Sequence, residues 1–385
     1  MKKILFVVDE QKMGGVSILL KDMIKVIDKK ENSITVLTLH NNGDSLEDLG
    51  SDAKLIYGTK FFEVIDLPLK EVLQSHSISK ILKKVYLVFL MKTGLISSKI
   101  KKERKKIFER DDFDIEIAFK DGFTALFTIY GPSKKKLHWL HYEYKKCNAN
   151  GNYYHLFNKI LPKYDNIIAV SEGVMNDFNS IYHLEDKTLV IENLVPEDKI
   201  ITKSRETVSL SLPTNRINII SVGRLHIQKG YDRLIIAMAN LSKKDQAKIN
   251  IDIYGDGPEK EHLSNLINEN KIKNITLKGR VDNPYKYLKK YDLFIMPSLY
   301  EPFGLVIVEA LTLHVPVLAC ENSATGKLIN HELNGYITPN SVEGITAGLK
   351  YIANNPDKIK EYKKNLKNYH YDNTEIIKKI NNILK

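Results

Sequence analysis

Two carboxylates, Glu301 and Glu309, stand in the segment YEPFGLVIVEA, after an apolar run that ends at Pro297. We expect a helix over residues 304–313, which places Glu301 at the helix entrance and Glu309 just over one turn inside it. The backbone N–H groups of residues 303–305 are then unpaired donors for sugar hydroxyls or a phosphate. Glu309 could accept two hydrogen bonds from a ribose diol. The alternative is that Glu301 caps the helix and Glu309 lies on a solvated face.

A cationic pair, Arg224 and Lys229, stands in SVGRLHIQKG, where a predicted strand runs into a glycine turn before a helix. Arg224 offers a planar bidentate fork and Lys229 a compact ammonium, a combination suited to a diphosphate whose charge grows as a bond breaks. Alone, such residues usually lie on a solvated surface. Both motifs follow the carboxyl ends of predicted strands, however, and open α/β sheets bind ligands there.

Glycines mark two further strand ends. Gly255 lies in YGDGP, and Gly14 and Gly15 lie between the first predicted strand and the first helix. Without a Cβ atom, the backbone at these positions can approach a phosphate or a sugar closely. A plain turn explains Gly255 equally well, and a lone Gly-Gly pair is a weak motif.

His141 follows a predicted strand in LHWLHYE and is a candidate for a catalytic role, whereas strand alternation turns His138 the other way. A single histidine is more often structural. Asp112 and Asp114 form a D-x-D pair, but they precede a strand, so we expect them to cap it. Because no His/Cys cluster has zinc spacing, the sequence does not predict a metal site.

The elements that position these residues alternate between strands and helices, which favours an α/β fold with two doubly wound parallel sheets. A polar, Pro-containing stretch at 193–215 predicts a linker between them. Before it, strands are expected at 3–8, 34–38, 114–118, 136–140 and 166–170, with a helix at about 16–27. After it, strands are expected at 217–222, 249–254, 275–278, 293–296 and 315–319, and helices at 231–242, 258–270, 304–313, 341–354 and 356–383.

A length of 385 residues favours two domains. We place an N-terminal Rossmann-like domain at 1–195, a C-terminal one at 196–365, and a last helix at 366–385 that crosses back to the first domain. The opening apolar run is too short for a signal peptide, no run is long enough to span a membrane, and Cys147 and Cys320 stand in unrelated contexts. We therefore expect a cytoplasmic protein.

A formal net charge of +11 indicates an anionic partner. The excess is local, since residues 79–106 hold ten Lys/Arg against the single acid Glu103. Apolar residues are interleaved with these lysines, a pattern typical of helices on an anionic membrane surface, here the inner face of the cell membrane. The alternative is a solvated helix packed on the first domain. We do not expect nucleic-acid binding, because the segment lacks the basic and aromatic alternation of a recognised module.

Taken together, these motifs resemble glycosyltransferase family 4, retaining enzymes of the GT-B fold, over most of the chain. The segments SVGRLHIQKG, IYGDGPEKEHL, DNPYKYLKKYDLFIMPSLYEPFGLVIVEAL and VPVLAC stand in the family's order and spacing. In the first half, GGVS and IIAVSEGV match in outline, and HWLHYEYKK is similar to a motif of capsule and surface-polysaccharide enzymes. Two features depart from the family: His314 stands where glycine is common, and residues 321–328 replace a Gly-Pro-x-Glu-Ile-like segment.

The resemblance implies two facing Rossmann-like domains with a donor cleft between them, and a role for each candidate residue. Arg224 and Lys229 would bind the donor diphosphate, Glu309 the ribose and Glu301 the transferred sugar, with His141 near the anomeric centre. The other implied donor contacts are the Gly14–Gly15 loop of the opposite domain, Gly255, the backbone of Phe303, Gly304 and Leu305 at the sugar, and Arg280 with Val281 beside the nucleobase.

The implied activity is retaining, metal-independent transfer of a hexose from a nucleotide-diphosphate sugar to a glycan or lipid-linked acceptor, in bacterial surface polysaccharide or glycoconjugate synthesis. A UDP-sugar is expected rather than a GDP-sugar, and no cofactor besides the donor. In such a same-face reaction the departing phosphate takes the acceptor's proton, so catalysis rests on positioning and electrostatics. The alternatives are a GT-B-like nucleotide-sugar epimerase and a non-enzymatic basic binder of nucleic acid.

Overall fold

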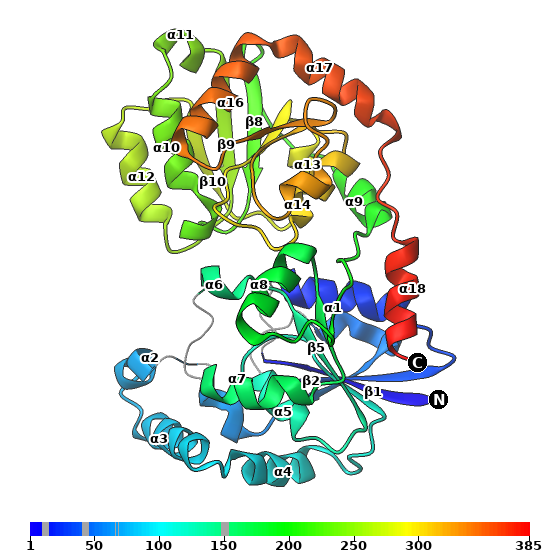
Figure 1. Ribbon diagram of the computed structural model, residues 1–385. Coiled ribbons are helices and arrows are strands. Elements are labelled where there is room, and N and C mark those ends of the chain that lie inside the picture. Colours follow the sequence, from blue (N-terminus) through cyan, green and yellow to red (C-terminus); the bar gives the residue numbers. More distant parts are fainter. Residues whose placement is uncertain (10–14, 41–45, 66, 68, 148–153) are drawn as a thin grey trace. The chain divides into compact units, whose positions relative to one another are not determined.

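The computed structural model describes the chain except for residues 10–14, 41–45, 66, 68 and 148–153 (Figure 1). The chain divides into two compact units. Unit 1 contains Met1–Leu194 and Thr374–Lys385, and unit 2 contains Val195–Asn373. The chain therefore passes from one unit to the other twice, once after Leu194 and once after Asn373.

Unit 1 is built on a seven-stranded parallel sheet with the strand order β3-β2-β1-β4-β5-β6-β7. Its strands are β1 (Lys2–Val8), β2 (Asn32–Thr38), β3 (Lys54–Tyr57), β4 (Ile115–Ala118), β5 (Lys135–Leu140), β6 (Asn166–Ala169) and β7 (Thr188–Val190). Residues 4–7 of β1 are fully buried, as expected of a central parallel strand that is covered on both faces.

Helices surround this sheet (Figure 1). They are α1 (Gly15–Val26), α2 (Leu69–Gln74), α3 (Ile78–Thr93), α4 (Ile96–Ile107), α5 (Phe123–Ile129), α6 (Tyr144–Cys147), α7 (Tyr154–Ile160), α8 (Glu172–Tyr182) and the C-terminal α18 (Thr374–Ile383). The last helix lies beside α1, where the Asn381 side chain donates to the Val26 carbonyl at 3.2 Å. This contact holds the C-terminal helix on unit 1.

Unit 2 has a six-stranded parallel sheet with the order β10-β9-β8-β11-β12-β13. Its strands are β8 (Ile217–Val222), β9 (Ile249–Tyr254), β10 (Ile275–Gly279), β11 (Leu293–Met296), β12 (Val317–Cys320) and β13 (Gly335–Thr338). Successive residues of β11 alternate between two apolar clusters, with Leu293 and Ile295 in one and Phe294 and Met296 in the other. The sheet therefore has a core on each face, which confirms the predicted doubly wound architecture.

The helices of unit 2 are α9 (Glu197–Ser204), α10 (Tyr231–Ala239), α11 (Lys243–Gln246), α12 (Lys260–Glu269), α13 (Tyr285–Leu288), α14 (Leu305–Thr312), α15 (Thr325–Leu328), α16 (Val342–Asn354) and α17 (Pro356–Asn365). Helix α16 begins at the N-cap Ser341, whose hydroxyl accepts from the Gly344 N–H at 3.0 Å.

The structure corrects two predictions. The predicted linker at 193–215 contains a helix, α9, and the predicted long helix at 356–383 is two helices, α17 and α18, separated by residues 366–373. The strands β3, β7 and β13 were not predicted. All three lie at sheet edges and are only partly buried, so their sequences lack the continuous apolar run of a central strand.

Each sheet has one point where the strand order reverses. In unit 2 the chain builds outward from β8 through β9 to β10, then returns to β11 beside β8 and builds the other way. In unit 1 the same reversal falls between β1 and β4. In parallel α/β sheets, ligands bind outside the carboxyl ends of the strands at such switch points.

Candidate functional site

Lys229 and Glu301 meet at the switch point of unit 2. Lys229 follows β8 and Glu301 follows β11, and their side chains form an ion pair with an Nζ to Oε2 distance of 2.6 Å. The two side chains are 19% and 14% exposed, so the pair is largely shielded yet reachable from solvent. The structure thus brings together Lys229 and Glu301, two residues of motifs that were expected to converge on one site because both follow strand ends.

Backbone contacts fix the two loops against each other. The Leu299 N–H donates to the Gln228 carbonyl at 2.9 Å, and the Gln228 side chain donates to the Tyr300 carbonyl at 3.1 Å. Gly230 has a φ of 64°, and a Cβ atom there would lie 2.2 Å from the Pro297 carbonyl oxygen. Only glycine permits this approach, so the glycine after Lys229 is needed to bring the lysine beside the β11 loop.

Gly255, at the end of β9, has a packing role. A Cβ atom there would lie 1.8 Å from the carbonyl oxygen of Gly223, and the Gly255 N–H donates to the Gly279 carbonyl at 2.9 Å. Gly255 therefore supports the loop that carries Arg224, which is exposed on the same carboxyl edge. Among the residues that the structure describes, no direct contact joins Arg224 to either carboxylate of the site.

The loop after β11 enters α14 through Gly304, which has a φ of 84° at the N-cap position and provides no side-chain cap. The first N–H groups of the helix, beginning at Leu305, are consequently available to a ligand. Phe303 is 7% exposed and anchors the loop in the core. The Ser323 hydroxyl donates to the Glu301 carbonyl at 3.1 Å. Segment 321–328, which replaces the Gly-Pro-x-Glu-Ile-like segment, therefore supports this loop.

Glu309 lies on α14, half-buried, and its Oε1 accepts a hydrogen bond from the Tyr285 hydroxyl at 3.0 Å. Arg280 and Val281 directly follow β10, the former exposed and the latter half-buried. All the unit 2 candidates except Glu309 thus lie in loops at the carboxyl edge of the sheet or at the start of α14, and Glu309 lies farther along that helix.

In unit 1, His141 follows β5 and is only 6% exposed. Its ring lies 4.9 Å from that of Phe119, the Phe119 backbone hydrogen-bonds it, and Nε2 has no partner. Burial lowers the pKa of His141 to about 4, against an ordinary value of 6.5. The imidazole is therefore neutral at pH 7, and its unpaired nitrogen can accept a hydrogen bond from a hydroxyl.

An ion pair also spans the switch point of unit 1. Asp9 follows β1 and Lys120 follows β4, with an Oδ2 to Nζ distance of 2.5 Å. Gly15 is exposed at the start of α1. Gly14, the other glycine of this predicted site, lies outside the described residues.

Sequence reasoning missed Asp121. This carboxylate follows β4 and accepts from His138 Nε2 at 3.0 Å and from the Tyr144 hydroxyl, while its Oδ2 is buried without a partner. Its position directly after a predicted strand was the available signal. His138, predicted to point away from His141, is fully buried and bound to this aspartate.

The basic segment 79–106 forms α3 and α4, and its charges serve two purposes. Lys84 is buried and donates to the carbonyls of Val64 and Ile65 at 3.0 Å each. Lysines at 80, 92, 101, 102 and 105 are exposed. Helix α3 also exposes a row of large apolar side chains at helical spacing: Ile78, Leu82, Val85, Tyr86 and Phe89.

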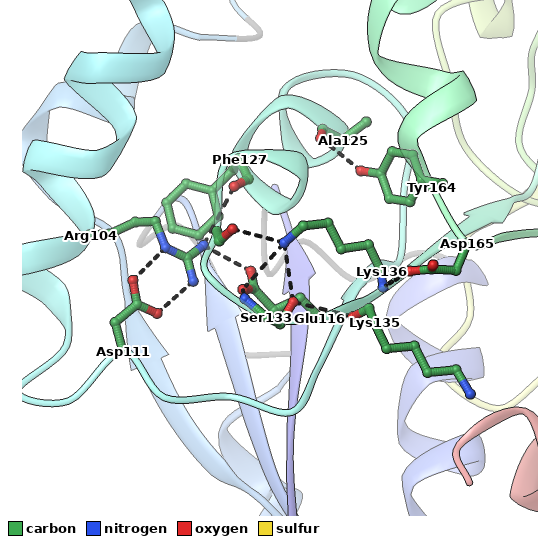
Figure 2. A network of polar contacts seen from close by, with 11 residues as sticks. Arg104, Asp111, Glu116, Ala125, Phe127, Ser133, Lys135, Lys136, Tyr164 and Asp165 are labelled. Atoms are coloured by element: carbon green, nitrogen blue, oxygen red, sulfur yellow. Dashed lines mark hydrogen bonds and ion pairs between the residues drawn. The ribbon is translucent and has the colours of Figure 1, made fainter.

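Arg104 anchors α4 to the sheet of unit 1 (Figure 2). Its guanidinium, 1% exposed, contacts the fully buried Glu116 of β4 at 2.9 Å and binds both oxygens of Asp111 at 2.6 and 2.7 Å. The Lys136 ammonium lies 3.9 Å from Glu116 on the other side. This network is structural, and so is the D-x-D pair: Asp114 accepts from the Lys3 N–H at 2.7 Å, which confirms the predicted strand cap.

Among the residues that the structure describes, no group of three or more His, Cys, Asp or Glu side chains could hold a metal ion. In the same residues, no helix combines the length and the apolar character that crossing a bilayer requires.

The chain is similar to known glycosyltransferases. Residues 202–371 match the family model of glycosyl transferases group 1. The chain is 31% identical, over 213 residues, to an uncharacterised glycosyltransferase of Methanocaldococcus jannaschii. It is 28% identical, over 233 residues, to the Campylobacter jejuni N-acetylgalactosamine-N,N'-diacetylbacillosaminyl-diphospho-undecaprenol 4-alpha-N-acetylgalactosaminyltransferase. These matches cover 50% and 58% of this chain, but only 54% and 60% of the two relatives.

The fold is also similar to that of a solved structure, Anabaena HepE in complex with UDP and glucose. The TM-score is 0.73 at 18% identity, and the match covers 100% of this chain and 99% of HepE. At this level of identity the likeness concerns the fold. The match to the glycosyl transferases group 1 model therefore lies within unit 2, and the chain has the two Rossmann-like parallel-sheet domains of the GT-B fold.

Proposed function

We propose that this chain is a retaining glycosyltransferase of family 4 that moves a hexose from a nucleotide-diphosphate sugar to a glycan or lipid-linked acceptor. The observation that carries the proposal is the Lys229–Glu301 pair at the switch point of a glycosyl transferases group 1 domain. It supplies a cation for a diphosphate beside a carboxylate for sugar hydroxyls. The HepE complex with UDP and glucose favours a UDP-sugar donor.

Five of the candidate side chains have a role in this proposal. Lys229 and Arg224 bind the diphosphate. Glu301 and the uncapped N–H groups of α14 form hydrogen bonds with the hydroxyls of the transferred sugar. Glu309 binds the ribose. The neutral His141 accepts a hydrogen bond from a sugar hydroxyl and does not act as an imidazolium acid.

The reaction proceeds on one face of the sugar. The bond between the anomeric carbon and the phosphate oxygen breaks, and the acceptor oxygen attacks the same face. The acceptor proton passes to the departing phosphate oxygen, so no protein nucleophile is needed. The negative charge that grows on the phosphate is stabilised by fixed cations and helix donors, and no metal is required.

We further propose that the acceptor is presented at an anionic membrane surface, in bacterial surface polysaccharide or glycoconjugate synthesis. The printed name of the Campylobacter relative includes a diphospho-undecaprenol acceptor. The side chains of the exposed apolar row of α3 are 46–74% exposed, which supports insertion into the membrane interface. The exposed lysines of α3 and α4 support attraction to anionic headgroups.

The donor proposal is tested by binding and product analysis. Thermal unfolding with UDP, GDP and their sugars, in EDTA, identifies the nucleotide, because a true ligand raises the melting temperature by mass action. NMR of the product then gives the anomeric configuration. An inverted product contradicts retention, and loss of activity in EDTA contradicts metal independence. Epimerised donor without a glycoside favours the epimerase alternative.

The membrane proposal is tested by flotation with vesicles of anionic or neutral lipid at low salt. The Phe89→Asp variant should lose binding, while Leu333→Asp, which alters an equally exposed apolar residue of unit 2, should not. If the wild-type protein does not float with anionic vesicles, the membrane proposal fails and α3 is a solvated helix. A gel shift with random duplex DNA tests the nucleic-acid alternative.

A further inference from the structure

Tyr285 contacts the carboxylate to which the proposed function assigns ribose binding. Its hydroxyl donates to Glu309 Oε1 at 3.0 Å, and both residues are half-buried. We propose, on the basis of that function, that Tyr285 is a positioning residue that orients Glu309 for the ribose hydroxyls of the donor.

The carboxylate needs such a partner. The terminal torsion angle of a glutamate side chain has a broad distribution, so the plane of its two oxygens is not fixed by rotamer preference. A ribose diol offers two O–H donors, and both are satisfied only if the carboxylate plane faces them. An ionised carboxylate offers about four lone-pair sites, and the Tyr285 phenol occupies one of them, on Oε1. Because it is uncharged, it orients the carboxylate without neutralising it.

Tyr285 itself is held by a chain of contacts. Its N–H donates to the Asn283 side-chain oxygen at 3.1 Å, and the Asn283 amide donates to the Lys203 carbonyl at the end of α9 at 2.9 Å. Asn283 is 8% exposed, so this link is shielded from water. The start of α13, and with it the Tyr285 backbone, is therefore held by two partly buried hydrogen bonds.

The test is a binding cycle with UDP and 2′,3′-dideoxy-UDP, measured by calorimetry on wild-type protein, Tyr285→Phe and Tyr287→Phe. Tyr287 is the matched control: it lies on the same helix, and its ring packs 4.8 Å from that of Tyr254. We expect Tyr285→Phe to weaken UDP binding about 10-fold, the size of one hydrogen bond to a charged group. With the dideoxy nucleotide, the wild type and Tyr285→Phe should bind equally, because no ribose hydroxyl remains to be oriented.

The outcomes separate this inference from the proposed function. If the wild type binds no nucleoside diphosphate, the proposed function fails and the inference fails with it. If the wild type prefers UDP over its dideoxy form and Tyr285→Phe keeps that preference, only the inference fails. If Tyr285→Phe weakens the binding of UDP and of its dideoxy form equally, or if Tyr287→Phe weakens UDP binding to a similar extent, Tyr285 has a general structural role. Either result also overturns the inference.

Discussion

Removing the charge of Glu301 should strengthen the binding of free UDP, even though Glu301 belongs to the proposed donor site. The Lys229 ammonium is paired with Glu301 at 2.6 Å, so a diphosphate has to compete with that carboxylate for the ammonium. In the Glu301→Gln variant the lysine is released, and the repulsion between the carboxylate and the phosphates is also removed.

The size of the effect follows from the exposure of the pair. Both side chains retain some contact with water, at 19% and 14% exposure, so the pair is worth about 1 kcal/mol, the upper end for surface pairs. Relief of about 1 kcal/mol corresponds to roughly 5-fold tighter UDP binding. Lys229→Met removes a charge-assisted contact worth about 1.5–3 kcal/mol and leaves Glu301 unneutralised, so UDP should bind at least about 10-fold more weakly.

Calorimetry with UDP and with the UDP-sugar that gives the largest thermal shift measures both effects. Glu301→Gln should bind UDP more tightly than the wild type but lose any preference for the sugar nucleotide, because its grip on the sugar is gone. Tenfold weaker UDP binding in Glu301→Gln would mean that Glu301 contacts the nucleotide. Unchanged UDP binding in Lys229→Met would remove the lysine from the diphosphate site altogether.

Three further predictions concern stability. Burial lowers the pKa of His141 from 6.5 to about 4, so between these pH values the unfolded chain binds this proton more readily than the folded chain. The contribution of His141 to the free energy of unfolding is therefore complete above pH 6.5 and falls by up to about 3 kcal/mol towards pH 4. Urea denaturation across this range should show a smaller fall in His141→Asn. Arg104→Met leaves Glu116 buried without its main partner and should cost about 3–5 kcal/mol in the same assay, whereas a loss below 1 kcal/mol would contradict the anchoring role. Asn373→Ala removes two reciprocal hydrogen bonds with the Val195 backbone, at 3.0 and 2.9 Å, and should lower the free energy of unfolding by about 1–2 kcal/mol.

The central strands could be predicted from the sequence because a strand that is buried on both faces has a continuous run of apolar residues. The predicted bounds of β8, β9 and β11 agree with the structure. The edge strand β13, GYIT, has no such run, since its middle residues are only half-buried. Helix α9 was read as linker because it is short and its polar residues outnumber its two isoleucines. Its helical state depends on packing against α13 and α14, which no local pattern reveals.

The convergence of the two motifs of the candidate site was predictable, but the direct contact between Lys229 and Glu301 was not. Strand-end position identified Lys229 and Glu301 separately, because parallel strands present their carboxyl ends on one edge. Their contact depends on β11 inserting beside β8, a choice of strand order made by the tertiary fold. Tyr285 and Asp121 were missed for a related reason: each contacts a partner supplied by another element, and neither belongs to a spacing that by itself indicates chemistry.

Helix α9 connects the proposed donor site to the two segments where the chain passes between units. Glu197, its first residue, accepts from the Thr312 hydroxyl at the end of α14 at 3.1 Å and from the Tyr371 N–H at 3.0 Å. Near the other end of α9, the Lys203 carbonyl accepts a hydrogen bond from the Asn283 side chain, which in turn contacts the helix that carries Tyr285. The outgoing and returning segments are themselves joined through Asn373. Because α14 carries Glu309, the proposed ribose-binding carboxylate, and α13 carries Tyr285, its proposed positioning residue, we expect a displacement of either crossing segment to alter the alignment of this pair. The polar segment after Asn193 is thus a structural part of unit 2, not a passive tether.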